Sequence, residues 1–406
     1  MKIILFTSSF PYGKGEQFLE TEIKCLSKEF DKVIIIPASY GGSTVLREIP
    51  RNIEVKNPIL TSRFKRIFNL RFLSILLNRE YLSISIQELF KSIKKGQLKL
   101  FLSEFNIAYY TLKEPFLSEL LKNITKQDVF YFYWGHGLSF VLPFIKNINV
   151  KKVFRVHRGD LYEHLNNNYF PFRKYQLEAC DYVCPISLDG CAYLLEKYPF
   201  TKEKIKLFRL GTTNHDYISP DKGNDFFHMV SCSSLIEVKR VGLIIDILSK
   251  IEYKKIIWTH FGDGYLKEDL LLKVKKLNQN IMVDFKGFTP NKEVLSFYQN
   301  HQIDLFINVS SSEGIPVSIM EATSYGIPVI ATDVGGAAES IDMQSGMLID
   351  KDFITKDVSN IILRIIDKKI VFDKKNVKEF WKKKFNAEKN YNNFSTFLKE
   401  LGSADC

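Results

Sequence analysis

The sequence lacks the features that mark several classes of protein. Its six cysteines form no CxxC pair and have no metal-ligand spacing, which excludes the common zinc-binding modules. No stretch comes near the roughly eighteen apolar residues that a membrane-spanning helix needs. The apolar run Ile3–Phe6 at the N-terminus is too short for the core of a signal peptide. We therefore expect a soluble or peripheral protein whose cysteines, such as Cys180, Cys184 and Cys191, are reduced thiols in or near the core.

Positive charge exceeds negative charge in this chain. Lys and Arg number 57 and Asp and Glu 46, which gives a formal net charge of +11. The excess fits an anionic membrane surface or a phosphate-rich small molecule, and it equally fits an ordinary solvated lysine surface. No helix-turn-helix, zinc-finger or RNA-recognition pattern accompanies it, so a nucleic-acid partner is not expected. The 406 residues, 45% of them apolar, can fill the cores of two domains.

The order of the predicted elements indicates an α/β fold. The buried strand Ile3–Phe6 is followed by a loop, an amphipathic helix and the strand Val33–Pro37, without any hairpin signal. Such an order predicts parallel, doubly wound sheets. Residues 211–225 are polar, contain Gly and Pro and have no apolar period, which is typical of a linker. We expect domains at residues 1–210 and 226–376.

The most informative stretch runs from residue 304 to residue 341. The apolar strand Leu305–Val309 enters a polar turn, Pro316 suits the first turn of a helix, and Val329–Ala331 forms the next buried strand. Two carboxylates have fixed places in this unit, Glu313 before the helix and Glu321 on it. A helix N-terminus that follows a strand offers free amides to a phosphate. A carboxylate beside it can accept hydrogen bonds from sugar hydroxyls.

This stretch resembles the donor-binding signature of the retaining GT-B glycosyltransferases of family 4 (glycosyl transferases group 1). The matching residues are Ser310, Glu313, Gly314, Pro316, Glu321, Ala322, Gly326, Pro328, Val329, Ile330, Ala331, Thr332, Gly335, Gly336 and Glu339. The resemblance implies two Rossmann-like domains that face a cleft, the first for an acceptor and the second for a nucleotide-sugar. It also implies that the C-terminal tail, residues 377–406, crosses back onto the first domain.

The resemblance assigns donor-side roles in the second domain. Glu321 would bind the ribose, Glu313 the donor sugar, and Lys239 the diphosphate. Relatives carry an arginine at the position of Ser234, which Arg240 could replace, although Lys239 and Arg240 also fit an ordinary surface pair. The remaining donor-binding candidates are Arg240, Ser234, Gly314, Ile315, Pro316, Val317, Gly287, Phe288, Gly262 and, from the first domain, Gly15.

The first domain carries two strand-end loops with histidines. His157 opens a His-Arg-Gly-Asp sequence that is similar to the family's H-x-x-D motif, whose histidine lies beside the donor sugar. With Glu313 and Lys239 it completes the catalytic candidates. A glycine loop after the first strand lies where many members have GGxE. The acceptor-side candidates are Gly13, Lys14, Glu16, His136 and Asp160. The alternatives are an ordinary glycine turn and structural histidines.

No metal or other cofactor is expected. The only D-x-D sequence is Asp350-Lys351-Asp352, and the lysine between its carboxylates makes it a poor metal–diphosphate motif. Residues 60–125 are helical in pattern and carry eleven Lys or Arg against five Glu, with Phe, Leu and Ile interleaved. That pattern suits a helix on anionic lipid, and it suits equally a helical insertion that packs on the domain.

The function expected from the resemblance is transfer of a hexose from a nucleotide-sugar, UDP rather than GDP. The acceptor would be a glycan or a polyprenyl- or lipid-linked hydroxyl in bacterial capsule, O-antigen or exopolysaccharide synthesis. The enzyme would act in the cytoplasm, at the inner face of the membrane. A non-catalytic nucleotide-sugar or glycan binder on the same fold is the alternative, and a sugar-nucleotide epimerase is a rival within the enzymes.

Overall fold

The computed structural model describes residues 1–60, 79–223 and 225–403, and these fall into two compact units. The first unit comprises residues 1–210 and 388–406, and the second comprises residues 211–387. Of the linker expected at residues 211–225, the described residues 211–223 and 225 belong to the second unit. The expected C-terminal tail is divided, since residues 377–387 belong to the second unit and only the residues from 388 on to the first.

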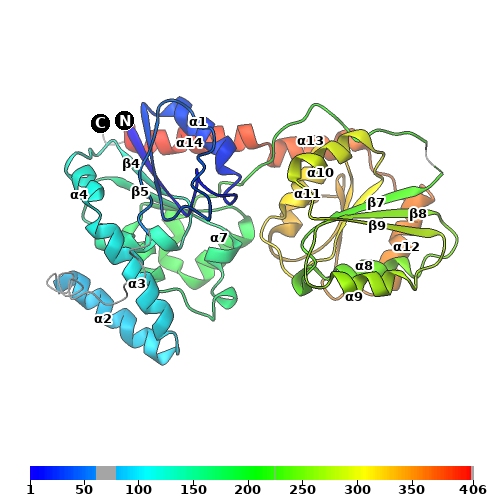
Figure 1. Cartoon of the computed structure of the whole chain (residues 1–406), viewed down its shortest axis with the longest axis horizontal. Coiled ribbons are helices and arrows are strands. Elements are labelled where there is room, and N and C mark those ends of the chain that lie inside the picture. The colour runs from blue at the N-terminus through cyan, green and yellow to red at the C-terminus, as the bar shows by residue number, and fades with distance from the viewer. Residues whose placement is uncertain (61–78, 224, 404–406) are drawn as a thin grey trace. The chain divides into compact units, whose positions relative to one another are not determined.

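The first unit is built on a six-stranded parallel sheet of order β3-β2-β1-β4-β5-β6. Figure 1 labels β4 and β5 of this sheet. The strands are β1 (Lys2–Thr7), β2 (Lys32–Pro37), β3 (Ile53–Val55), β4 (Val129–Phe132), β5 (Lys151–Val156) and β6 (Tyr182–Pro185). The helices are α1 (Leu19–Glu29), α2 (Arg79–Lys94), α3 (Leu98–Lys113), α4 (Pro115–Lys122), α5 (Arg158–Leu161), α6 (Arg173–Ala179), α7 (Leu188–Lys197) and α14 (Ala387–Ser403). Ile4 and Phe6 enter one core cluster and Ile3 and Leu5 another, because side chains alternate between the two faces of a strand. The predicted doubly wound sheet is thus confirmed.

Helix α14 is part of the core of the first unit. Phe394 and Leu398 are fully buried among residues of β1, β4 and α1. Beneath Phe394 lies an ion pair that is itself fully buried, with Arg155 Nη1 2.5 Å from Glu22 Oε2 and the arginine 4.2 Å from the ring of Phe394. The Tyr131 hydroxyl donates to the other carboxylate oxygen at 2.8 Å. This cluster joins α1, β4, β5 and α14.

The second unit repeats the plan with a six-stranded parallel sheet of order β12-β11-β10-β7-β8-β9. The strands are β7 (Phe227–Cys232), β8 (Ile256–Phe261), β9 (Ile281–Gly287), β10 (Leu305–Asn308), β11 (Val329–Thr332) and β12 (Gly346–Ile349). The helices are α8 (Val241–Leu248), α9 (Lys267–Val274), α10 (Asn291–Asn300), α11 (Val317–Ser324), α12 (Thr355–Ile366) and α13 (Lys374–Lys384). Trp381 of α13 is fully buried against Ile315 and Met320, which explains why this part of the tail belongs here.

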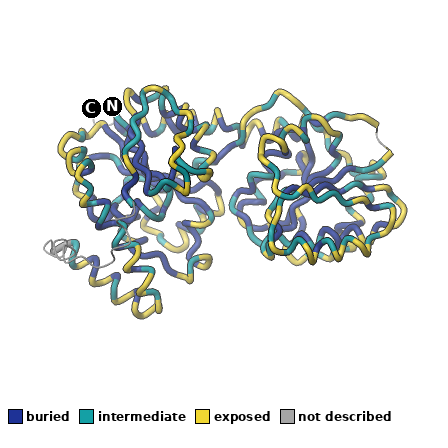
Figure 2. The backbone as a smooth tube through the Cα atoms, in the orientation of Figure 1, coloured by how far each residue is buried: buried dark blue, intermediate teal, exposed yellow. Residues whose placement is uncertain are grey.

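Figure 2 shows that burial is concentrated on the strands of each sheet, as expected for parallel sheets covered on both faces. The basic stretch forms α2, α3 and α4, apart from residues 61–78, which lie outside the described residues. Phe101 and Phe105 of α3 pack against Phe140 and Phe144, so the prediction of a helical insertion packed on the domain is confirmed for α3. None of the helices described combines the length and the apolar character needed to cross a bilayer.

Candidate functional site

The second-unit candidates gather where the order of the strands reverses. β7 comes first in the sequence of this sheet and lies between β10 and β8. The loops that follow β7 and β10 therefore both start at the carboxyl ends of the strands and run in opposite directions. Such a switch point is where open α/β sheets bind ligands. Lys239 follows β7, Glu313 follows β10, and Lys239 Nζ lies 2.7 Å from Glu313 Oε1. Asn308 Nδ2 donates to the same oxygen at 3.3 Å.

Main-chain contacts fix the loop that carries Glu313. The Ser311 amide donates to the Val238 carbonyl at 2.8 Å, which ties this loop to the one that carries Lys239. Behind it lies the Gly335-Gly336 turn. A Cβ on Gly335 would lie 2.2 Å from the Glu313 carbonyl oxygen, and Gly335 has a φ of +52°. The second glycine turn of the sequence signature is therefore needed to let two backbones meet.

The N-terminus of α11 faces the same edge. Pro316 is its N-cap residue, and no side chain caps the helix. The expected donor-binding residues Gly314, Ile315, Pro316 and Val317 form this turn, whose first amides have no partner inside the helix. Because helix N-termini carry partial positive charge, the turn and Lys239 together provide cationic character beside Glu313.

Glu321 lies one turn further along α11 and is 9% exposed. Asn291 Nδ2, at the start of α10, donates to its Oε1 at 2.6 Å. Burial raises the pKa of Glu321 to about 7, and the hydrogen bond from Asn291 opposes that rise. The hydroxyl of Tyr298, which is fully buried and interacts electrostatically with Glu321, has no hydrogen-bond partner among the described residues. A buried carboxyl that titrates near neutrality is a common mark of a functional site.

Arg240 is held by main-chain groups. Its Nε donates to the Val309 carbonyl at 2.7 Å and its Nη1 to the Lys351 carbonyl at 2.8 Å. The guanidinium thus braces the end of β10, while Ser234 is exposed and offers only a hydroxyl. Lys239 remains the cation that points at Glu313.

The other donor-side glycines bring turns together. Gly262 has a φ of +137°, and a Cβ on it would lie 1.9 Å from the Ser233 carbonyl oxygen, so the turns after β8 and β7 touch through their backbones. The Gly262 amide donates to the Gly287 carbonyl at 2.9 Å. Phe288, next to Gly287, is 81% exposed. An exposed aromatic ring beside a glycine turn is suited to stacking on a flat ligand.

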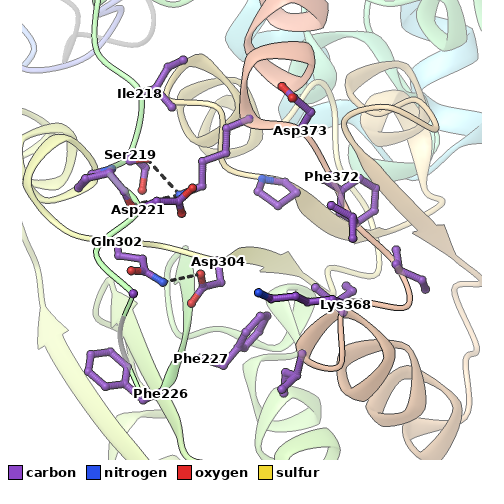
Figure 3. Close-up of a pocket in the computed structure, with 18 of the residues that line it drawn as sticks. Ile218, Ser219, Asp221, Phe226, Phe227, Gln302, Asp304, Lys368, Phe372 and Asp373 are labelled. Atoms are coloured by element: carbon purple, nitrogen blue, oxygen red, sulfur yellow. Dashed lines mark hydrogen bonds and ion pairs between the residues drawn. The ribbon is translucent and has the colours of Figure 1, made fainter.

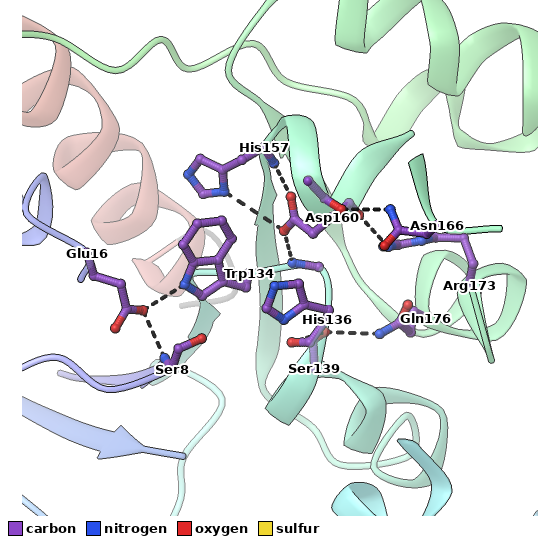
Figure 4. A network of polar contacts seen from close by, with 12 residues as sticks. Ser8, Glu16, Trp134, His136, Ser139, His157, Asp160, Asn166, Arg173 and Gln176 are labelled. Atoms are coloured by element: carbon purple, nitrogen blue, oxygen red, sulfur yellow. Dashed lines mark hydrogen bonds and ion pairs between the residues drawn. The ribbon is translucent and has the colours of Figure 1, made fainter. Parts of the chain in front are cut away.

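In the first unit, the loops after β4 and β5 share one carboxylate (Figure 4). Asp160 accepts hydrogen bonds from the Gly135 amide and the His157 amide, each at 2.5 Å. Burial by itself raises the pKa of Asp160, but the interactions with His157, His136 and the Gly135 amide outweigh it and hold the pKa below its usual value. Its Oδ2 lies 3.9 Å from His157 Nδ1.

The His157 ring is packed among aromatic rings on one side and faces Asp160 on the other. It is 8% exposed and lies 4.3 Å from the Trp134 ring, measured between centroids, and Trp134 stacks on His136. Neither ring nitrogen of His157 has a hydrogen-bond partner among the described residues. The ring is not isolated, because His157 and Asp160 cap the start of α5 reciprocally and Nδ1 faces the Asp160 carboxylate at 3.9 Å. Nε2 is therefore the ring nitrogen that a ligand can reach.

Glu16 and the glycine loop have a local structural role. The Glu16 carboxylate accepts the amides of Ser8, Ser9 and Phe10 and, at 2.7 Å, the indole N–H of Trp134. Arg47 holds the loop from outside, donating to the carbonyls of Gly13 and Gly15. Lys14 and Gly15 are exposed. The fold therefore supplies hydrogen-bond donors to both oxygens of the Glu16 carboxylate, while Lys14 is exposed and makes no ion pair with a described residue.

Three residues that position the site were not among the sequence candidates. Asn291 begins a helix shortly after the Gly287 turn. Its place after the end of a predicted strand is the signal by which the sequence could have identified it. Trp134 lies in the same strand-end loop as His136. Arg47 lies in a segment without periodicity, so nothing in the sequence marked it.

A separate cavity of about 1070 Å³ opens at the amino ends of the strands of the second sheet, on the side opposite to the candidate site (Figure 3). Phe227, which begins β7, and Asp304, which precedes β10, line it, and so does Lys368. Lys374 is paired with Asp221 there at 3.1 Å. No predicted site residue lines this cavity. Among the residues that the structure describes, no cluster of three His, Cys, Asp or Glu could hold a metal ion.

Comparisons with known proteins identify a family that matches the second unit. Residues 218–390 match the family model described as glycosyl transferases group 1. Among curated proteins, a Streptococcus parasanguinis UDP-N-acetylglucosamine–peptide N-acetylglucosaminyltransferase, GtfA subunit, is 24% identical over 68% of this chain and 56% of its own length. The colanic acid biosynthesis glycosyltransferase WcaL of Escherichia coli, itself named as putative, is 27% identical over 46% of this chain and 48% of its own length. The chain thus spans about half the length of these relatives.

Solved structures match over the whole chain. The lipopolysaccharide outer core galactosyltransferase WaaB gives a TM-score of 0.68 at 14% identity, covering 98% of this chain and 100% of that chain. HepE of Anabaena, solved in complex with UDP, gives 0.67 at 16% identity with the same coverage. At these identities the likeness shows the fold, and that fold is GT-B. The part that matches the glycosyl transferases group 1 family, residues 218–390, covers nearly all of the second unit, residues 211–387.

Proposed function

We propose that the protein is a retaining glycosyltransferase of family 4 that transfers a hexose from a UDP-sugar to a hydroxyl of a glycan or lipid-linked acceptor. The observation that carries the proposal is the Lys239–Glu313 pair at the switch point of a glycosyl transferases group 1 domain. It combines a cation for phosphate with a carboxylate for sugar hydroxyls beside an uncapped helix N-terminus.

The donor would be held from three sides. Lys239 and the first amides of α11 would bind its diphosphate. Lys239 would then no longer pair with Glu313, and the Glu313 carboxylate could accept hydrogen bonds from the sugar. Its ribose hydroxyls would donate to Glu321, which Asn291 orients. Phe288 and the Gly287 turn would contact the base. A UDP-sugar is chosen because HepE was solved with UDP-glucose and the GtfA relative is named for a UDP-sugar.

Transfer would be driven by stabilisation of the leaving diphosphate. Negative charge grows on it in the transition state, and preorganised cations and amides stabilise that charge without rearranging. The leaving phosphate oxygen would take the proton of the acceptor hydroxyl, so the anomeric configuration is retained without a protein nucleophile. Lys239 and the helix amides would supply the positive charge that a divalent ion supplies elsewhere.

The first unit would bind the acceptor. Nε2 of His157 would contact the transferred sugar, and the acceptor would lie beside Trp134, His136 and Lys14. Curated relatives are named for colanic acid, O-antigen and amylovoran biosynthesis, and for this reason we propose a bacterial surface polysaccharide as the product. A lipid-linked acceptor would place the enzyme in the cytoplasm, at the inner face of the membrane.

A non-catalytic nucleotide-sugar binder is the second candidate. It is favoured by the exposed Ser234 at the position of the family's arginine and by the engagement of Arg240 with main-chain carbonyls. Incubation with UDP-, GDP- and dTDP-hexoses and a mixture of lipid-linked acceptors, with and without EDTA, separates the two. We expect EDTA-resistant release of UDP and a product with the donor's anomeric configuration. Binding without release of nucleotide would favour the second candidate.

The affinity for the donor should depend on the ionisation of Glu321. Its pKa is raised to about 7 by burial, and ribose hydroxyls donate best to the carboxylate, so affinity should rise with pH through neutrality. Between pH 6 and pH 8 the ionised fraction of Glu321 increases about tenfold, so the affinity for the donor can rise by no more than about tenfold over this range. Calorimetric titration with UDP-glucose, whose diphosphate does not titrate in this range, measures it. The Glu321→Gln variant should bind weakly and with a flat pH profile, and an unchanged slope in that variant would contradict the assignment.

A further inference from the structure

Helix α2 presents an apolar stripe on its outer face. Ile86, Phe90 and Ile93 are spaced as one face of a helix, and they are 42%, 62% and 53% exposed. Leu98 and Leu102, one turn apart on α3, are 39% and 40% exposed. Several large apolar side chains gathered on neighbouring helices mark an interaction surface more than scattered exposed residues do.

The opposite face of α2 is held by the domain, so the stripe cannot turn inward. Ile84 is buried with Phe101 and Phe105 of α3. Glu88 is 2% exposed and accepts a hydrogen bond from the Tyr169 hydroxyl at 2.8 Å. The helix therefore has one face for the core and a second apolar stripe without a use in the described structure.

Positive charge flanks this stripe. Lys94 and Lys99 are exposed and make no ion pair with any described residue, while Lys91 and Lys95 lie beside them along the chain. The acidic groups nearby add little opposing charge. The Glu88 carboxylate is buried and lies 3.5 Å from Lys91 Nζ, and burial raises the pKa of Glu104 to about 7.

We propose that the outer face of α2, with the start of α3, docks on an anionic lipid bilayer. Apolar side chains at the centre and lysines at the border match the acyl and headgroup layers of such a surface, as in interfacial amphipathic helices. A second copy of the chain would bring the same lysines face to face, so charge complementarity favours lipid. The inference extends the proposed use of a lipid-linked acceptor, but docking itself needs neither donor nor acceptor.

Vesicle co-sedimentation with the full chain tests this proposal. Vesicles of phosphatidylcholine with about one third phosphatidylglycerol should bind the protein, pure phosphatidylcholine vesicles should bind it at least tenfold more weakly, and added salt should weaken binding. The double variant Phe90→Glu and Ile93→Glu should lose at least tenfold. Lys94→Glu with Lys99→Glu should lose binding to anionic vesicles specifically.

A matched control is Met343→Glu in the second unit, since Met343 is 93% exposed and remote in sequence from α2. Met343→Glu should bind vesicles as the unmodified chain does. Equal binding by the Phe90/Ile93 variant would overturn the proposal. So would sedimentation equilibrium showing a dimer that this variant abolishes. UDP binding measured in parallel keeps the two proposals separate. If the unmodified chain binds UDP but does not bind anionic vesicles, docking alone is contradicted; if it binds vesicles but no nucleotide, the proposed function alone is contradicted.

Discussion

Replacing Lys239 with alanine is expected to lower turnover of the donor by about 10²–10³-fold, the usual cost of losing one preorganised group that stabilises developing negative charge. Lys239 lies 2.7 Å from Glu313 at the strand switch point, and it is the cation that can leave its partner for a diphosphate. Donor affinity should fall less than turnover, because the charge on the diphosphate is largest in the transition state. Steady-state kinetics of nucleotide release measures both effects.

A matched lysine serves as the control. Lys254 also forms a 2.7 Å ion pair, with Asp367, but it lines the separate cavity at the amino ends of the strands of the same sheet. Lys254→Ala should keep full activity, and thermal unfolding should show that both variants fold. Equal kinetics for Lys239→Ala and Lys254→Ala would show that the pair at the switch point has no catalytic use.

Replacing Glu22 with alanine should destabilise the first unit by about 3–5 kcal/mol, the cost of removing one partner of a buried ion pair. Arg155 and Glu22 are both fully buried, and two of the three guanidinium nitrogens, Nε and Nη2, have no hydrogen-bond partner among the described residues. Without Glu22 the cation would stay buried and uncompensated. Urea denaturation followed by circular dichroism measures the loss.

Glu20 provides the comparison on the same helix. It pairs with Arg47 at 2.9 Å, but its side chain is 53% exposed, so Glu20→Ala should cost no more than about 1 kcal/mol. The double variant Glu22→Leu with Arg155→Met removes both charges and should recover much of the stability lost in Glu22→Ala. A Glu22→Ala protein as stable as Glu20→Ala would mean that the buried pair does not hold α1 and α14 to the sheet.

The fold could be predicted well because its strands are apolar runs at regular places. Leu305–Val309 and Val329–Ala331 are buried on both faces, which parallel sheets require, and the structure has strands there. The second glycine turn was also predictable, since only glycine allows Gly335 and Gly336 to approach the Glu313 loop. These features depend on local sequence.

The partners of the predicted residues were harder to predict, because contacts between distant segments leave no local pattern. Arg240 was expected as a possible phosphate ligand, yet its guanidinium binds main-chain carbonyls 69 and 111 residues away. Glu16 was expected on the acceptor side, and the sequence did not predict that its carboxylate accepts the amides of its own loop and the Trp134 indole N–H. Asn291, which orients Glu321, lies 30 residues from it. Each of these contacts depends on the tertiary fold.

The central claim is that a nucleoside diphosphate binds at the carboxyl ends of the strands of the second sheet, through Lys239 and Glu321. Calorimetric titration tests it directly. UDP, GDP and dTDP, and separately the nucleoside of each, are titrated into the unmodified chain, Lys239→Ala and Glu321→Ala, and the affinities are compared. We predict that one diphosphate binds at least tenfold more tightly than its nucleoside, that Lys239→Ala removes most of that difference, and that Glu321→Ala weakens both ligands. No preference for any diphosphate, or the same preference in Lys239→Ala, would contradict the claim.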